Sequence, residues 1–315
     1  MLQKDRPIAN ANRPVSQSHA SPGTVLVVRH RTEYRYVRPV HFGEHRGMFR
    51  PRDSHDLRLL DTTLSITPTA SIRWLHDVFG NSVVIARFSE DHPANTLVFE
   101  SVFRARHYPV PVARLNLDPG IRRYPFNSPA SEAPDLAPYS ARQYPDPDGA
   151  VRSWARGFLS SDGTADTLGL LNAMNQAINR DFLYVRRPED GTQPPVLTLT
   201  SRSGTCRDYA LLMMEAVRSL GLAARFVSGY LYDETRLDAS MLVGGGETHA
   251  WLQVYLPGAG WVEFDPTNAL TAGRNLIRVA VARDPSQAIP LSGTFVGSDD
   301  DAISMHVSVS VSAGS

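Results

Sequence analysis

The stretch 248–268, THAWLQVYLPGAGWVEFDPTN, determines how the second half of the chain folds. Apolar and polar side chains alternate from 249 to 256 and again from 260 to 265, which is the period of a β-strand. The intervening PGAG is typical of a tight turn. We therefore predict an antiparallel hairpin that carries His249 on its first strand and Asp265 at the end of its second.

The register of this hairpin determines whether His249 and Asp265 can meet. Residues that face each other in an antiparallel pair have numbers that add to a constant. If the constant is 514 or 516, Asp265 lies directly or diagonally opposite His249, with Cβ atoms about 5 to 8 Å apart. An odd constant would put the two side chains on opposite faces of the sheet. The alternative for this pair is a buried structural histidine and an aspartate that caps a strand.

The segment 204–221, GTCRDYALLMMEAVRSLG, contains the only cysteine of the chain. Its apolar spacing predicts a helix from about Gly204 to Leu220, closed by Gly221. In the first turn, Cys206 meets unpaired N–H groups and the positive end of the helix dipole, which favour the thiolate. Asp208 opposes this ionisation slightly, so a nucleophilic cysteine needs a base. The alternative is a small buried core residue.

Four blocks in chain order, GTCRDYA, SGYLY, THAW and GWVEFDPTN, resemble the bacterial transglutaminase-like family of the papain-like cysteine-enzyme superfamily. Upstream, HRTEYRYVRPV, RPRDSHDLRLL and DVFGNSV resemble the N-terminal β-domain of these proteins. The resemblance covers roughly residues 25–297. It implies Cys206 as nucleophile, His249 as base and Asp265 as the carboxylate that orients it. For three other residues of these blocks we expect packing and hydrogen-bonding roles: Asp208, Tyr209 and Tyr230.

The implied fold is α+β, in which an all-β sandwich precedes a catalytic domain whose cysteine-bearing helix packs on an antiparallel sheet with His and Asp. Composition divides the chain into a disordered tail (1–22), the sandwich (23–124), a Pro-rich linker or strapping loop (125–148) and the catalytic domain (149–315). Helices are expected within 149–159 and 164–182 and a loop over 186–196. The Ser-Val alternation near the C-terminus predicts an edge strand.

Charge and composition exclude several function classes. The 32 basic and 32 acidic residues leave no net field for nucleic acid, and no apolar run approaches the length of a membrane span. The first twenty residues lack the apolar core of a secretion signal, so we predict a cytoplasmic protein. One cysteine cannot form an intramolecular disulfide or a multi-cysteine zinc site. We expect a peptide or protein substrate, no cofactor and no metal.

A competing motif lies near the N-terminus. His41, Glu44 and His45 fit H-x-x-E-H, which on a helix would place two zinc ligands and a glutamate base together. Pro39, Gly43 and the strand-like flank argue against a helix there. The arginines around it form an anion-binding patch or lie on exposed strand faces: Arg29, Arg31, Arg35, Arg38, Arg46, Arg50 and Arg52.

The predicted reaction is acyl transfer through a thioester on Cys206. Hydrolysis of a peptide or glutaminyl amide is favoured, because an amine competes with about 55 M water only in a site that holds it and excludes solvent. Trp251 and Tyr255 are the only candidate aromatic walls for such a site. The alternatives are protein-glutamine amine transfer and a non-catalytic binding module. The segment 233–247, with three successive glycines, predicts a mobile loop beside the cleft.

Overall fold

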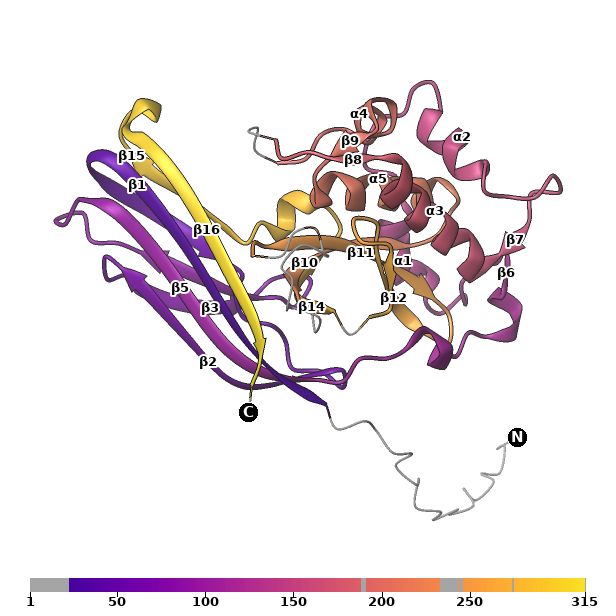
Figure 1. The fold of residues 1–315 in the computed structure, drawn as a ribbon, viewed down its shortest axis with the longest axis horizontal. Coiled ribbons are helices and arrows are strands. Elements are labelled where there is room, and N and C mark those ends of the chain that lie inside the picture. Colours follow the sequence, from indigo (N-terminus) through magenta and orange to yellow (C-terminus); the bar gives the residue numbers. More distant parts are fainter. Residues whose placement is uncertain (1–22, 188–190, 233–242, 244–245, 274, 315) are drawn as a thin grey trace, which may run out of the picture.

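The computed structural model of the chain describes residues 23–187, 191–232, 243, 246–273 and 275–314 (Figure 1). The predicted disordered tail over 1–22 and most of the predicted 233–247 loop lie outside these residues. The described chain forms a β-sandwich beside a mixed α+β unit. The expected α+β fold with a sheet-rich N-terminal region is confirmed.

The long strand β1 organises the sandwich, because it is shared by two layers. Its first half pairs with β5 and β16, and its second half with β4 and β15. Side chains from both layers, among them Phe42, Val84 and Phe99, form one buried core. The strands are β1 (Thr24–Gly47), β2 (Leu57–Thr67), β3 (Ser71–His76), β4 (Ser82–Arg87), β5 (Ala94–His107), β15 (Leu291–Val296) and β16 (Ala302–Ala313).

The last two strands of the sandwich correct the predicted domain boundary. The catalytic domain was expected to run over 149–315, but β15 and β16 leave it and pair antiparallel with β1. The Ser-Val run is an edge strand as predicted, with Val309 and Val311 buried. Alternation identifies a half-buried strand but not its partner. Only the structure shows that this partner lies more than 260 residues earlier, at Leu26↔Ala313.

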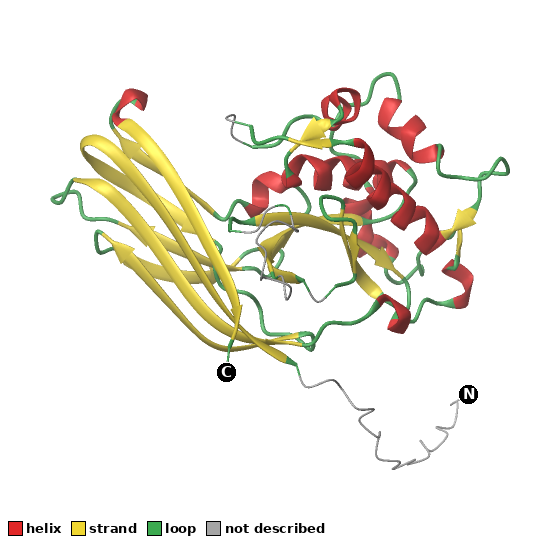
Figure 2. Ribbon diagram, viewed as in Figure 1, coloured by secondary structure: helices red, strands yellow, loops and turns green. Residues whose placement is uncertain are grey.

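The second unit is built on a five-stranded antiparallel sheet in the order β13-β12-β11-β10-β14. Figure 2 shows its helices gathered on one side of this sheet, and α5 packs on β10 and β11. None of the helices in the described residues is long and apolar enough to cross a membrane. The bounds are β10 (Ala224–Leu231), β11 (His249–Leu256), β12 (Gly260–Asp265), β13 (Leu270–Thr271), β14 (Leu276–Ala282), α2 (Ala150–Arg156), α3 (Thr167–Asp181) and α5 (Cys206–Ser219).

The Pro-rich segment 125–148 is more ordered than a linker. It contains the helix α1 (Ala133–Ser140), which begins with a proline in its first turn, where the missing N–H costs nothing. Beyond α1, the backbone N–H groups of Gln143 and Tyr144 donate to the buried Glu215 of α5. The segment therefore acts as a strap across the catalytic unit. A second unpredicted helix, α4 (Pro195–Ser201), begins at the end of the expected 186–196 loop.

The free face of the catalytic sheet packs against the sandwich. Side chains of β10 and β14 meet those of β1, β5 and β16 in one apolar cluster, which includes Tyr230, Ile277 and Val309. Buried polar contacts cross the same junction. His30 Nδ1 lies 2.8 Å from the Tyr230 hydroxyl, and Asn81 Nδ2 donates to the Val281 carbonyl at 2.7 Å. The two units are thus joined through a continuous interior.

Candidate active site

The start of α5 holds Cys206 in place. Thr205 is the N-cap, and its N–H and hydroxyl donate to Asp208 Oδ2 at 2.8 and 2.9 Å. Arg187 binds the same fully buried carboxylate with two nitrogens, at 2.9 and 3.0 Å, and the Gln193 N–H donates to it at 2.8 Å. Asp208 therefore joins the start of α5 to Arg187 and Gln193, and the charge of Arg187 balances its own. Cys206, the first residue of the helix, is 7% exposed.

The predicted hairpin has the register that brings His249 and Asp265 together. Leu252 faces Phe264, so the constant is 516 and Asp265 lies diagonally across from His249. His249 Nε2 donates to Asp265 Oδ2 at 2.9 Å, and both side chains are fully buried. Asp265 also accepts from the Thr267 N–H at 3.0 Å and from Asn268 Nδ2 at 2.9 Å. These bonds fix the carboxylate, which in turn fixes the imidazole.

A glycine of the SGYLY block makes room behind this histidine. Gly229 faces His249 across β10 and β11. A Cβ atom at this position would lie 2.1 Å from the Ile277 carbonyl oxygen and 2.7 Å from the ring of Trp251. Trp251 in turn stacks on the His249 ring, with centroids 5.9 Å apart. Only a residue without a side chain allows this close approach.

The Cys206 thiol and the His249 imidazole shift each other's pKa. Burial alone would raise the pKa of Cys206, but His249, Arg207 and the N–H of Ala250 outweigh burial and lower it. Burial would likewise lower the pKa of His249, but Asp265 and the Cys206 thiolate raise it above its ordinary value. Opposite shifts in two neighbouring groups favour thiolate and imidazolium together. The sequence indicated Cys206, His249 and Asp265 as candidates, and in the structure these three residues lie together.

Two further residues of the site were not found from the sequence. Tyr184 lies on β8 (Leu183–Tyr184), which pairs in parallel with β9 (Ser203–Gly204) immediately before Cys206. Burial and the Cys206 thiolate raise the pKa of its phenol well above the ordinary range. Asn268 bonds Asp265, as described above. The DPTN sequence was a usable signal for Asn268, whereas nothing in FLYV indicated a partner for the cysteine.

A cleft of about 720 Å³ opens between the sandwich and the catalytic unit. Arg207 and Thr248, the chain neighbours of Cys206 and His249, are among the residues that line it, as is Gly191. The remaining lining residues lie on β1, β15 and β16 or just before β15. The volume suits a ligand of several residues' size. The cleft could not be predicted, because the sequence did not show that β15 and β16 return to the sandwich.

The H-x-x-E-H motif lies within β1 rather than on a helix. His41 is exposed, His45 is buried with Nδ1 on the Gly43 carbonyl at 3.0 Å, and Glu44 pairs with Arg87 at 2.8 Å. Within the described part of the chain, no group of three or more His, Cys, Asp or Glu side chains is arranged to hold a metal ion. The expected strand context of the motif is confirmed.

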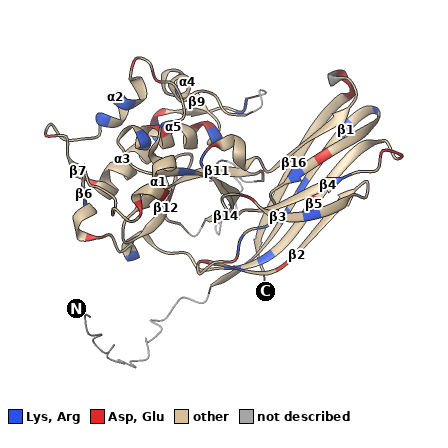
Figure 3. Ribbon diagram, turned by 180° about the vertical axis from the view of Figure 1, so that it is seen from behind, with Lys and Arg blue, Asp and Glu red and all other residues tan. Residues whose placement is uncertain are grey.

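The arginines around this motif do not gather in one patch either. On the ribbon of Figure 3, positions of basic residues are spread over several sandwich strands, with acidic positions among them. Arg31 and Arg35 pair with Glu33, and Arg38 pairs with Asp301. With Arg46, which pairs with Asp77 at 3.5 Å, four of the seven arginines belong to ion pairs of the sandwich. This agrees with the interpretation that they lie on strand faces.

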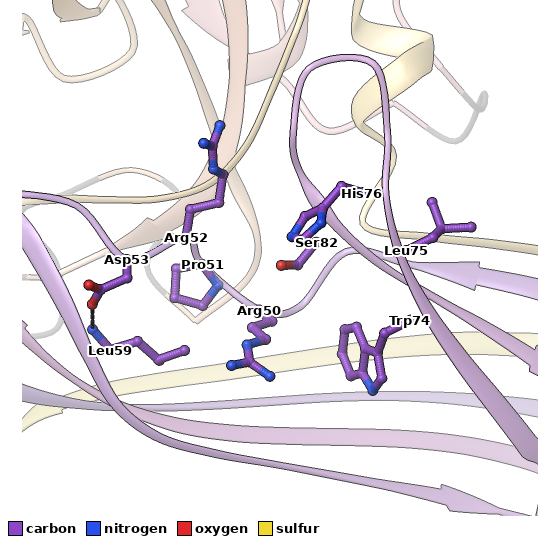
Figure 4. A pocket seen from close by; sticks show the side chains of 9 residues that line it. All are labelled: Arg50, Pro51, Arg52, Asp53, Leu59, Trp74, Leu75, His76 and Ser82. Carbon is purple, nitrogen blue, oxygen red and sulfur yellow. Dashed lines mark hydrogen bonds between the residues drawn. The ribbon is translucent and has the colours of Figure 1, made fainter.

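Two arginines of the run border a second cavity of about 390 Å³ in the sandwich (Figure 4). Arg50 lies beside Trp74 there, while Arg52 donates to the Phe79 carbonyl at 3.3 Å. Asp53, on the same wall, accepts from the Leu59 N–H at 2.8 Å. None of the residues that line this cavity belongs to the Cys206 site.

Comparison with known families agrees with this geometry. The model of the transglutaminase-like superfamily matches residues 152–266, which include Cys206, His249 and Asp265. The model of the bacterial transglutaminase-like N-terminal region matches residues 26–106. The chain belongs to the transglutaminase-like superfamily. Its N-terminal sandwich is the region that precedes the core in bacterial members.

Individual relatives cover different parts of the chain. Uncharacterised proteins of Mycobacterium bovis and Mycobacterium tuberculosis are 29% identical over 291 residues, which is 90% of this chain and 91% of theirs. A protein-glutamine gamma-glutamyltransferase of Pseudomonas aeruginosa is 33% identical over 109 residues, 33% of this chain and 16% of its own. A candidate cysteine protease from Cytophaga hutchinsonii has the same fold, with a TM-score of 0.69 at 18% identity over 94% of this chain and 93% of its own.

Proposed function

We propose that the protein is a cysteine acyl-transfer enzyme that acts on carboxamide or peptide bonds through a thioester. One observation carries the proposal: Cys206 is buried at the start of a helix, His249 lowers the pKa of its thiol, and Asp265 holds that histidine at 2.9 Å. Nucleophile, base and orienting carboxylate are the three groups that such a reaction needs. A non-catalytic binding module, the third alternative, has no use for this combination.

The proposed reaction proceeds in two halves. The Cys206 thiolate attacks the carbonyl carbon, and the resulting oxyanion collapses as the C–N bond breaks. The imidazolium of His249 gives its proton to the leaving nitrogen, which departs as ammonia or an amine and leaves a thioester. Water then attacks the thioester, His249 takes one proton from it, and the carboxylic acid leaves as the thiolate is restored.

The oxyanion needs donors that point at the carbonyl oxygen. The backbone N–H of Cys206, in the first turn of α5, is free of helical partners and is one donor. We assign the second to the Tyr184 phenol, which interacts with the sulfur and stays protonated because its pKa is raised. Removing one such donor typically costs a factor of about 100 to 1,000 in turnover.

Hydrolysis is favoured over amine transfer by the placement of the aromatic side chains. Trp251 is fully buried behind His249, and Tyr255 packs on Trp261, with centroids 5.4 Å apart. Neither lines the cleft to which Arg207 belongs, and the aromatic side chains that do line it, Tyr34, Tyr36 and Phe295, come from the sandwich strands. The second candidate is protein-glutamine amine transfer, because the Pseudomonas relative is named a protein-glutamine gamma-glutamyltransferase.

The test is incubation with a glutaminyl dipeptide, with and without cadaverine, followed by ammonia release and mass spectrometry. We expect ammonia and a glutamate product without added amine, and no activity in Cys206→Ala. Product that forms only with cadaverine, covalently joined to it, would establish amine transfer. Ammonia release that survives Cys206→Ala would contradict the proposal altogether. The cytoplasmic location also remains a proposal, and recovery of the protein in a periplasmic fraction of its host would contradict it.

A further inference from the structure

The edge of β16 faces the cleft, and its backbone groups can be assigned from the register. Residues of β1 and β16 pair regularly from Leu26↔Ala313 to Arg35↔Ser304. In an antiparallel pair, positions alternate between residues that bond to each other and residues whose N–H and C=O groups point outward. Two hydrogen bonds show which residues of β16 bond to β1 and which point their backbone groups outward. The Gly314 N–H donates to the Val25 carbonyl, and the Val309 N–H points away from β1 to the Gly246 carbonyl at 2.8 Å.

Val309 is therefore an outward position, and by the two-residue period so are Val307 and Met305. Val307 faces Thr32 and Met305 faces Tyr34 in the same unbroken register. Both line the cleft, whereas the Val309 edge is already used by Gly246. Within the described residues, β16 pairs with no strand other than β1. Among the residues that the structure describes, the backbone edge of Met305 and Val307 therefore has no strand partner.

This edge is continuous with the active site. Gly246, which occupies the edge at Val309, lies three residues before His249. Arg207 and Thr248, the chain neighbours of Cys206 and His249, line the same cleft as Met305 and Val307. The side chain of Met305 is 58% exposed and continues the row of Val309 and Val311 along one face. A chain that extends the Gly246 contact along β16 would therefore run through the cleft that Arg207 and Thr248, the neighbours of Cys206 and His249, also line.

We propose that the substrate is an extended polypeptide segment that adds to the free edge of β16 as a further strand, with its reactive carbonyl delivered to Cys206. An unpaired strand edge recognises a peptide backbone through main-chain hydrogen bonds, and it selects extended over folded substrates. The proposal rests on the acyl-transfer function and adds its substrate class. It also gives the sandwich a role in the reaction, because residues of β1 and β16, which run side by side in Figure 1, line the cleft.

The test uses Met305→Pro, with Met305→Thr as its matched control. Proline removes the outward N–H and is tolerated on an edge strand, and no bond to β1 is lost because Met305 N–H does not face β1. Threonine keeps the N–H and changes only the side chain. The substrates are native α-lactalbumin and the same protein reduced and carboxymethylated, so that sequence is constant and only folding differs. Turnover of p-nitrophenyl acetate measures the reactivity of the Cys206 thiolate, and this small ester does not need the cleft.

We expect the wild type to act at least tenfold faster on the unfolded substrate than on the native one. Met305→Pro should lower kcat/KM for the unfolded substrate about tenfold and leave ester turnover within twofold, while Met305→Thr stays within threefold on both. Equal losses in the two variants, or none in Met305→Pro, would overturn strand addition. A dimer that Met305→Pro dissociates would assign the edge to a second copy and also overturn it.

If the Met305→Pro protein does not fold, a second measurement tests strand addition. A peptide released from the unfolded substrate is resynthesised with single N-methyl groups at successive residues. Strand addition predicts that turnover falls at every second position, whereas a uniform pattern contradicts it. Ester turnover without action on any polypeptide would refute this proposal and leave the thiolate intact. Loss of both activities in the folded wild type would refute the proposed function itself.

Discussion

Replacing Asp208 by Asn should separate the positioning of Cys206 from the stability of α5. Asp208 is fully buried and accepts hydrogen bonds from Arg187, Gln193 and Thr205. An amide of the same shape carries no charge and turns one acceptor into a donor that faces other donors. The helix cap and the bonded carboxylate next to the nucleophile are weakened together.

The expected loss of stability follows from the ion pair between Asp208 and Arg187. Breaking a buried pair by neutralising one partner typically destabilises a protein by about 3 to 5 kcal/mol. At about 2 °C per kcal/mol for a chain of this size, the midpoint of thermal unfolding should fall by roughly 6 to 10 °C. Glu215→Gln is the matched control, because Glu215 is equally buried on the same helix and pairs with Arg218 at 2.9 Å. It should lower the midpoint by a similar amount.

The assay that distinguishes the two variants is the alkylation of Cys206 by iodoacetamide at 25 °C, well below either midpoint. We expect the rate to fall at least tenfold in Asp208→Asn and to stay within twofold in Glu215→Gln, because only Asp208 holds the first turn of α5. If both variants lose stability and both react like the wild type, Asp208 supports the fold alone and the reasoning about positioning is wrong.

Three further predictions concern the same site. In His249→Ala, burial remains and the partner that lowers the thiol pKa is lost, so the midpoint of the alkylation profile should move from below to above the reference value of about 8.5; a profile that does not move contradicts the ion pair. Tyr184→Phe should lower amide turnover at least tenfold and leave the alkylation rate at high pH within twofold, and unchanged turnover would remove Tyr184 as an oxyanion donor. Gly229→Ala should cost about 2 kcal/mol or more in urea unfolding, since its Cβ would sit 2.1 Å from a carbonyl oxygen, while Gly120→Ala, with no atom within 4 Å of the added Cβ, stays near wild type.

The parts of the fold that the sequence predicted are local. Apolar spacing indicated α3 and α5, and the positive φ of Gly221 closes the latter helix as expected. The His249 and Asp265 hairpin needed only alternation and an even register, because both residues lie within one turn-connected pair of strands. The meeting of Cys206 with them rested on resemblance, since 43 residues separate the cysteine from the histidine.

The parts that failed depend on distant partners. Six prolines over 125–148 left a linker and a strapping loop open, and only the structure shows that the buried Glu215 supplies the acceptor that docks the segment on α5. The strand β16 was identified as an edge, but nothing local indicated that its partner is β1. The cleft and the β16 edge follow from that pairing. The proposed substrate site could therefore not be predicted from the sequence, although the candidate nucleophile could.

The most direct test of the central claim is the intact mass of the protein after rapid acid quenching with a glutaminyl peptide. The account predicts an adduct equal to the peptide minus ammonia, located on Cys206 by fragmentation, absent in Cys206→Ala and strongly reduced in His249→Ala. A protein that consumes the peptide while its Cys206 stays unmodified at every quench time, or an adduct that forms equally well without His249, would contradict the account.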